Sequence, residues 1–220
     1  MKIGQTQAVT AVIITGITLS AVSATYIWGT PILEKRQSQQ QLVQTEEEVK
    51  NLYNALDSVR NSGEGASERI DLGFSEGTNI YINETGNYIE VTTTAQSSPY
   101  AKGTWFLLEG KRIQGLSVGE GTYGRKGQDS AGAIALRATG SETVTLQYRA
   151  EFRNLYTETS SGPSLETLDI QAQGGQQATG ETTAIISNNG MVTDAGTDAV
   201  ETETGETLPR DRTVATVEFR

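Results

Sequence analysis

The sequence predicts an α+β protein in which a long N-terminal hydrophobic helix leads into a β-rich domain. Three zones of distinct composition predict this layout. Residues 5–33 carry no charge, residues 34–62 are polar and contain neither Pro nor Gly, and residues 63–220 are rich in Gly, Thr, Ser and β-branched side chains. We expect an apolar helix, its amphipathic extension and a β-rich domain in that order, with residues 1–4 as a short leader.

The first helix is predicted from its length and its lack of charge. Ala8–Trp28 spans 21 residues, or roughly 31 Å of α-helix, which is about the thickness of the hydrocarbon layer of a bilayer. Tyr26 and Trp28 stand at its far end, where aromatic rings settle at a membrane–water interface. We therefore predict a transmembrane helix with these two residues as its interface anchors.

The amphipathic extension is predicted from a stripe of apolar residues. Leu42, Val49 and Leu56 recur every seven residues, and Leu52 and Val59 fall three positions after the last two. This spacing places all five residues on one helix face. We expect that face to pack on the β-rich domain of the same chain.

Local features refine the extension. Thr45 interrupts the stripe, and Gln37–Gln41 has no stripe at all, so we expect a solvated neck there. Pro31 is expected to start or kink this second helix, because its ring clashes with the carbonyl four residues earlier. Gly63 and Gly65 supply a stop signal after the last apolar residue of the stripe.

The β-rich domain is predicted from short runs of alternating apolar residues between turns. Asn79–Asn83 and Tyr88–Thr94 flank the turn Glu84–Asn87 and are typical of a hairpin. Further strands are expected at Ile70–Phe74, Thr104–Leu108, Arg112–Val118, Ala133–Ala138, Thr143–Phe152, Leu165–Gln171, Thr183–Ile186 and Val214–Phe219. Gly190–Glu206 is acidic and weakly patterned, which indicates an exposed loop or irregular hairpin. Such short strands favour a β-sandwich-like, immunoglobulin-like domain.

The composition excludes several classes of function. The chain has no His and no Cys, which removes Ser-His-Asp and Cys-His catalysis, disulfides and ordinary structural zinc sites. Its formal net charge of −10 argues against nucleic-acid partners, which need clustered Lys and Arg. We expect no catalytic residue, no cofactor and no metal site, and hence no enzyme.

Two other patterns each allow two interpretations. Four carboxylates of the acidic loop could gather around a calcium ion, but without an ordered ligand spacing a solvated loop is the better interpretation. They are Asp194, Asp198, Glu201 and Glu203. Trp105 and Phe106 lie in an expected strand, and we interpret them as core residues rather than as a platform for stacking ligands.

The opening apolar segment allows three interpretations. A secretory signal peptide could be cut after Ala24, but apolar residues continue past that point to Leu33. A plain lipid anchor would be rich in Leu, Ile and Phe. A third possibility is a helix that packs against other helices.

Small residues favour the third interpretation. Only one Leu occurs between Ala8 and Trp28, whereas Gly16, Ser20 and Ala24 recur at intervals of four residues. Small residues in this pattern let helix backbones approach closely, and hydroxyl groups can bond across the contact. The sequence therefore predicts a helix that packs against copies of itself.

The start of the chain resembles a known class of leader. The segment Lys2-Ile3-Gly4-Gln5-Thr6-Gln7, followed directly by the uncharged helix, resembles the class III signal peptide of archaeal type IV pilin-like proteins and archaellins. The resemblance implies that a membrane leader peptidase cuts between Gly4 and Gln5, unless the leader is retained. It also implies an apolar helix, an amphipathic extension and a C-terminal β-domain.

The resemblance implies a structural subunit of a filament on the cell surface. The subunit would first be inserted in the cytoplasmic membrane and would then polymerise with copies of itself, helped by the leader peptidase and the pilus assembly machinery. Neighbouring helices would replace the lipid around residues 5–33. The β-domain, residues 63–220, would form the extracellular sheath.

The sequence also allows two other functions and contains one candidate modification site. The chain could instead be a single-pass surface protein that displays its β-domain for binding or adhesion, or a secreted hydrolase that uses carboxylates. Asn83-Glu84-Thr85 fits the acceptor pattern for N-glycosylation at the expected hairpin turn. Asn83 therefore either carries a glycan or simply begins the turn.

Overall fold

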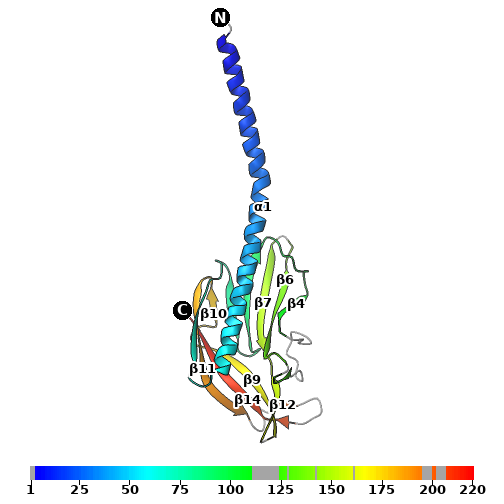
Figure 1. Cartoon of the computed structure of the whole chain (residues 1–220), viewed down its shortest axis with the longest axis vertical. Helices are drawn as coiled ribbons and strands as arrows, with labels where there is room; N and C mark the ends of the chain where they lie inside the picture. Colours follow the sequence, from blue (N-terminus) through cyan, green and yellow to red (C-terminus); the bar gives the residue numbers. More distant parts are fainter. Residues whose placement is uncertain are drawn as a thin grey trace.

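One helix and two six-stranded sheets form most of the described structure. The structure is a computed structural model and describes residues 3–110, 124–127, 129–141, 143–160, 162–194, 200–201 and 207–220. The helix projects from one end of the strand-rich region, with the N-terminus at its far tip (Figure 1). The α+β class predicted from the sequence is confirmed.

Helix α1 runs without interruption from Ile3 to Asn61. The prediction that Pro31 starts a second helix is wrong, because this residue lies inside α1. A proline removes one intrahelical hydrogen bond, and the regular bonds on either side carry the helix through that position. The helix ends where the sequence predicts, before Gly63 and Gly65, whose φ angles of 84° and 82° do not continue an α-helix.

The C-terminal half of α1 buries the predicted stripe and four residues more, of which Tyr53 and Ala55 lie within the range of the stripe. The stripe residues Leu42, Val49, Leu52, Leu56 and Val59 are all buried. Ser38 and Thr45 are buried as well, so the neck is not wholly solvated and the stripe is not interrupted. Helix geometry, and not polarity, decides which positions face the domain. Thr45 tolerates burial because its hydroxyl donates to the carbonyl of Gln41 over 2.8 Å.

The first sheet has the strand order β1-β11-β14-β9-β8-β5. Its strands are β1 (Ser67–Leu72), β11 (Thr182–Asp194), β14 (Arg210–Phe219), β9 (Gly162–Ala172), β8 (Leu155–Thr159) and β5 (Gly124–Arg125). The pairs β14–β9 and β5–β8 are parallel, and the other neighbours are antiparallel. The C-terminal strand is therefore central in this sheet.

The second sheet has the strand order β10-β2-β3-β7-β6-β4, with every pair antiparallel. Its strands are β10 (Gln177–Thr179), β2 (Asn79–Asn83), β3 (Tyr88–Ala95), β7 (Val144–Phe152), β6 (Gly132–Thr139) and β4 (Trp105–Glu109). A separate small pair joins β12 (Val200–Glu201) to β13 (Thr207–Leu208). The predicted hairpin is confirmed as β2 and β3, in which Ile82 pairs with Ile89.

Several strands differ from their predicted bounds. Strand β11 runs on past Ile186, into the segment expected to be a loop, with a register shift between Asn188 and Met191. An irregularity of this kind accommodates the polar Asn-Asn-Gly run without ending the strand. Strands β8 and β10 are not predicted, because each is short and without clear alternation. The predicted strand Arg112–Val118 lies outside the described residues.

A single core joins the helix to both sheets. Buried residues of α1 share one cluster with the inward side chains of β2, β3, β6 and β7 from one sheet and of β1, β9, β11 and β14 from the other. Tyr53 of α1 stacks on Phe152 of β7 with ring centroids 5.1 Å apart. The C-terminal half of α1 thus lies across both sheets (Figure 1), and the strand-rich region is built around the helix.

Candidate interaction helix

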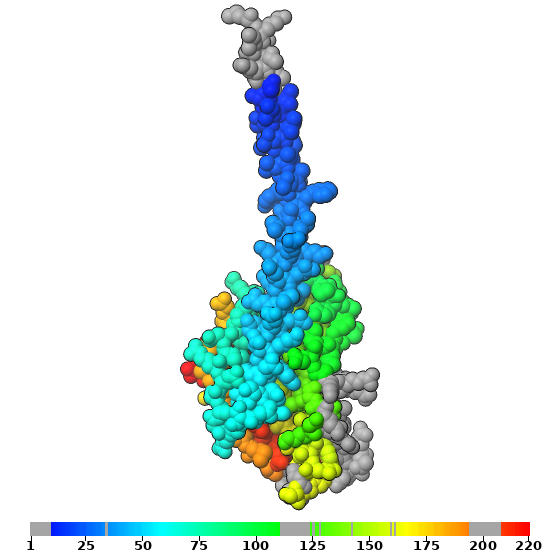
Figure 2. All heavy atoms as spheres, viewed as in Figure 1, coloured from blue at the N-terminus to red at the C-terminus, as the bar shows by residue number. Residues whose placement is uncertain are grey.

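The N-terminal half of α1 is an apolar surface that the rest of the chain leaves uncovered. Its large exposed apolar residues are Val12, Ile13, Ile14, Ile17, Leu19, Val22, Tyr26, Ile27, Trp28, Ile32 and Leu33. Figure 2 shows this segment standing clear of the strand-rich region. In the part of the chain that the structure describes, α1 is the one helix long and apolar enough to span a membrane.

The two predicted interface anchors lie on this uncovered segment. Tyr26 is 74% exposed and Trp28 is 80% exposed, so neither packs on its own domain. Lys35 and Arg36 follow within about two and a half turns and are exposed as well. This order, from apolar run to aromatic rings to charges, is typical of a membrane boundary. Their role as anchors stays a prediction.

The three small residues lie on one face of the helix, as their spacing predicts. Nothing stands within 4 Å of the position that a Cβ of Gly16 would occupy, so this face is open. Ser38, the first buried residue of the stripe, follows Ser20 by 18 residues, which is about five turns. The face formed by Gly16, Ser20 and Ala24 therefore continues the face that α1 turns toward its own domain.

Four hydroxyl groups of this segment bond to their own helix. Ser20 donates to the carbonyl of Gly16 over 2.8 Å, and Thr18, Thr25 and Thr30 each donate to the carbonyl four residues earlier over 2.8–2.9 Å. These donors are satisfied without a neighbouring helix. The hydrogen bonds across helices expected from the sequence are therefore not needed for the segment to enter an apolar environment.

The expected cleavage point lies in the first turn of α1. Gly4 and Gln5 are helical, and their side chains lie outside what the structure describes. Cleavage between them stays a prediction.

Asn83 is the last residue of β2, directly before the turn that leads to β3. Its Oδ1 accepts a hydrogen bond from the backbone N–H of Gly86 over 2.7 Å, and its Nδ2 donates to the hydroxyl of Tyr88 over 2.9 Å. Asn83 therefore begins the turn, as one interpretation holds. Thr85 of the same triplet is exposed. Occupancy by a glycan stays a prediction.

Trp105 lies on the outer face of the second sheet, and the prediction that it belongs to the core is wrong. The guanidinium groups of Arg137 and Arg149 lie 4.7 and 5.0 Å from its ring centroid, and Arg149 also lies 4.1 Å from the ring of Tyr88. Alternation along β4 places Phe106 on the other face, where its ring lies against Tyr100. These cation–π contacts cannot be predicted from the sequence, because they depend on which residues of neighbouring strands the register places side by side.

The same face holds a buried carboxylate. Glu151 is only 2% exposed, and burial raises the pKa of its carboxyl group, while Arg149, 3.3 Å away, works in the opposite direction. Arg149 also pairs with Glu90 over 3.2 Å. Arg149 thus pairs with one carboxylate of its own strand and with one of the neighbouring strand β3, which gives these charges a structural part in the sheet.

The described residues contain no group of three or more Asp and Glu side chains placed to hold a metal ion. Of the four carboxylates considered for calcium, Asp198 and Glu203 lie outside the described residues, as do the side chains of Asp194 and Glu201.

Comparisons with known proteins identify no relative of the chain. No protein-family model matches it, and searches of curated proteins and of solved structures also returned no match.

Proposed function

We propose that the chain is the structural subunit of a type IV pilus-like filament on the cell surface of an archaeon. It polymerises through its N-terminal hydrophobic helix, and the β-rich region, an immunoglobulin-like sandwich in this proposal, forms the outer sheath. Copies of the same chain are its partners in the filament. The cytoplasmic membrane holds the subunit before assembly, and a leader peptidase acting at Gly4 and the assembly machinery complete the pathway.

One observation carries this proposal: α1 is half core and half uncovered apolar surface. Val49 and Leu56 are fixed in the domain core, while Ile17 and Ile27 of the same unbroken helix are 65% and 67% exposed. Covering a Val, Leu or Ile side chain stabilises by about 1.5–3 kcal/mol. Covering all eleven large exposed apolar residues would therefore contribute more free energy than the ~5–15 kcal/mol by which a typical domain is stable against unfolding. Lipid or other helices must cover this segment.

A second candidate is a single-pass surface protein that never polymerises and displays its β-rich region for binding or adhesion. The hydrogen bonds from Ser20 and Thr25 to their own helix favour this candidate, because they let one isolated helix reside in lipid. The same bonds also suit a filament subunit that waits in the membrane before assembly.

Electron microscopy separates the two candidates. Cells that express the chain should carry surface fibres whose subunit is this protein, and mass spectrometry of the fibres should give an N-terminus at Gln5. A protein that stays in the membrane fraction as a monomer, on cells without fibres, would instead establish the single-pass alternative. An N-terminus at Met1 within genuine fibres would remove only the cleavage step.

A further inference from the structure

The two edges of the second sheet carry opposite charges that the chain itself does not neutralise. This sheet ends in β10 on one side and in β4 on the other. Lys102 stands shortly before β4, and Glu181 stands shortly after β10. Neither residue makes an ion pair within the described part of the chain. Each edge therefore offers a charge to a neighbouring molecule.

The edge at β4 combines cations with aromatic and apolar side chains. Lys102 is exposed, and its Nζ donates to a backbone carbonyl over 3.1 Å. Arg137, on the neighbouring strand β6, donates to the side-chain oxygen of Gln147 over 2.6 and 3.0 Å and lies against the ring of Trp105. Leu107 of β4 is 46% exposed. We call Lys102, Trp105, Leu107 and Arg137 the cationic edge, and aromatic residues and Arg are enriched where proteins contact each other.

The edge at β10 ends in a groove that carboxylates line. The groove has a volume of about 470 Å³ and lies between α1 and the loops after β1 and β10. Glu76 and Glu181 line it, both are exposed, and neither has an ion-pair partner among the described residues. Glu48 of α1 lines an adjoining hollow together with Glu181. We call the hollow lined by Glu76 and Glu181 the carboxylate groove.

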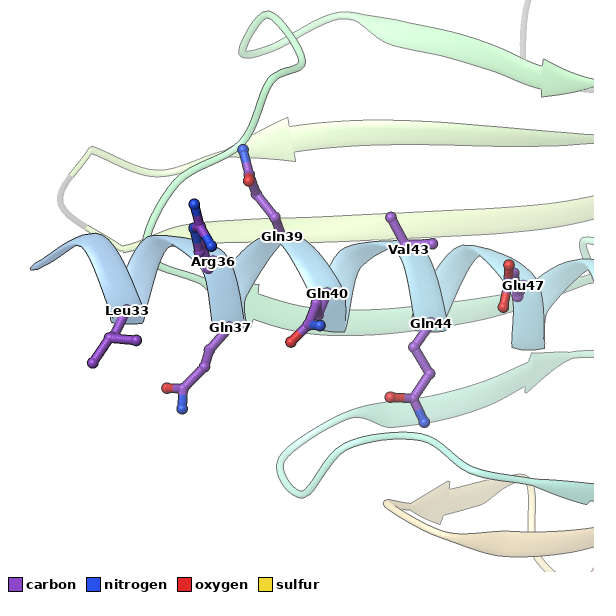
Figure 3. Close-up of a pocket in the computed structure, with 8 residues that line it drawn as sticks. All are labelled: Leu33, Arg36, Gln37, Gln39, Gln40, Val43, Gln44 and Glu47. Atoms are coloured by element: carbon purple, nitrogen blue, oxygen red, sulfur yellow. The ribbon is translucent and has the colours of Figure 1, made fainter. Parts of the chain in front are cut away.

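Helix α1 connects the two edges at one height. On one flank, Gln44 donates from its Nε2 to the carbonyl of Gly73 in the wall of the carboxylate groove over 2.6 Å. Figure 3 shows this side chain on the opposite side of α1 from Val43. On the other flank, Glu46 accepts from the hydroxyl of Tyr100 over 3.0 Å. Residues two positions apart on a helix point about 200° apart, so the two flanks are held at the same level.

One row of paired residues runs across the second sheet from edge to edge. It passes through all six strands, by way of Thr179, Asn79, Thr92, Gln147, Arg137 and Trp105. Adjacent strands lie about 4.8 Å apart, so the two ends of the row are about 24 Å apart. The carboxylate groove and the cationic edge therefore lie at one level on opposite sides of the sheet.

We propose that neighbouring copies of this chain contact each other side by side, with the cationic edge of one copy against the carboxylate groove of the next. Lys102 of one copy then faces Glu181 of its neighbour. The proposal rests on the proposed function, because copies inserted in one membrane or assembled in one filament run parallel. Parallel copies present opposite charges to each other at equal height, whereas two edges of the same kind repel each other.

The placement of the two edges suits an open polymer. Each copy meets one neighbour through its cationic edge and another through its carboxylate groove, and these neighbours lie on opposite sides of it. A contact between two different surfaces does not close on itself as a symmetric dimer does. The described residues contain no group of three or more acidic side chains placed to hold a metal ion. The carboxylate groove therefore suits separate cationic side chains better than one ion.

Zero-length cross-linking of the natural full-length chain tests the contact. A carbodiimide joins an amine to a touching carboxylate as an amide, and the reagent takes up the water that is lost. Treated filaments or membranes should give a ladder of linked copies, and mass spectrometry of their digests should find Lys102 joined to Glu181 or Glu76. About 24 Å separate the two edges within one chain, so such a link joins two copies. Lys102→Gln, which has no amine at this position, should lose the link.

Charge reversal gives an independent measurement. Lys102→Glu or Glu181→Lys alone should reduce the yield of filaments several-fold, and the exchange Lys102→Glu/Glu181→Lys should restore it. Glu158→Lys, at an exposed position of β8, changes the net charge as Glu181→Lys does and should assemble like the natural chain. All these positions are exposed, so each variant should keep the Tm of the natural chain.

The outcomes are distinguishable. A link at Lys102 between copies, together with rescue by the exchange, supports the contact. Filaments without this link, or single reversals that assemble like the natural chain, overturn the contact and leave the proposed function standing. A link from Lys102 to a different protein overturns a second copy as the occupant of the carboxylate groove. Absence of both filaments and links overturns the contact and the proposed function together.

Discussion

The side-chain amide of Asn188 donates a hydrogen bond to the carbonyl oxygen of Val59 over 3.0 Å, although 129 positions separate the two residues. Val59 lies in the last turns of α1, where helix carbonyls lose their intrahelical partners. The Oδ1 of Asn188 accepts from the backbone N–H of Gly190 over 2.9 Å. One buried side chain thus connects the end of α1 to the irregular part of β11.

Replacing Asn188 should weaken this connection. The Val59 carbonyl also accepts from the backbone N–H of Ser62 over 3.2 Å. Asn188→Ala removes the two buried hydrogen bonds of the Asn188 side chain, to Val59 and Gly190, so the free energy of unfolding should fall by about 1–3 kcal/mol. Denaturant titration in detergent, followed by circular dichroism, measures the change. The matched control is Asn189→Ala, at an exposed neighbour, which should change stability little. Equal losses from both variants would contradict the role of Asn188.

The buried stripe of α1 should behave as core. Leu56 is fully buried, and Leu56→Ala should lower the free energy of unfolding by about 2–5 kcal/mol through lost burial and the cavity left behind. Val43→Ala, at a position of the same helix that is 55% exposed, should change the free energy of unfolding far less. Denaturant titration of both variants compares them. Similar effects at the two positions would show that the helix does not pack as described.

Bulk on the small-residue face should block assembly but not insertion. Gly16→Phe or Ser20→Phe keeps the segment apolar, so the protein should still enter the membrane, while close helix approach is lost. Membrane fractionation reports insertion, and electron microscopy reports fibres. Ile14→Phe is the control, because it exchanges one large apolar residue for another. Fibres of normal number from the Gly16 and Ser20 variants would refute close packing at this face.

Two substitutions distinguish the role of Asn83 as a glycan acceptor from its role in the turn. Thr85→Ala destroys the acceptor triplet but keeps the hydrogen bonds of Asn83, so it should remove the mass of one glycan and leave Tm unchanged. Asn83→Gln should remove the same mass and also lower Tm, because the longer side chain misses Gly86 and Tyr88. Intact-mass spectrometry and thermal melting provide the two readings. An unchanged mass in both variants would mean that the natural site carries no glycan.

Alkaline pH should destabilise the junction between α1 and the second sheet. Burial, together with the carboxylate of Glu46 at 3.0 Å, raises the pKa of Tyr100 to about 12. An unfolded Tyr ionises near pH 10, so the contribution of Tyr100 is complete below pH 10 and is lost as the pH rises toward 12. Unfolding free energies measured from pH 8 to 12 should fall less steeply for Tyr100→Phe than for the natural chain. Parallel slopes would contradict this assignment.

The sequence alone determined the parts of the fold that depend on local pattern. Uncharged residues from Ala8 to Trp28 identified the apolar helix, the heptad spacing of Leu42 to Val59 identified its buried face, and the alternation around Glu84–Asn87 identified the hairpin. Each of these is a local pattern along the chain. Such a pattern can be recognised without knowing which residues pack against it in the folded protein.

Only the tertiary structure decided which segments pack against these elements. Ser38 and Thr45 are buried because the two sheets close over their side of the helix, and Trp105 faces outward because the pairing of β4 with β6 sets it beside Arg137. Register between strands and packing between distant segments are contacts across space, and no local period encodes them. The uncovered apolar helix was visible in the sequence; which of its faces remains free for a neighbour was not.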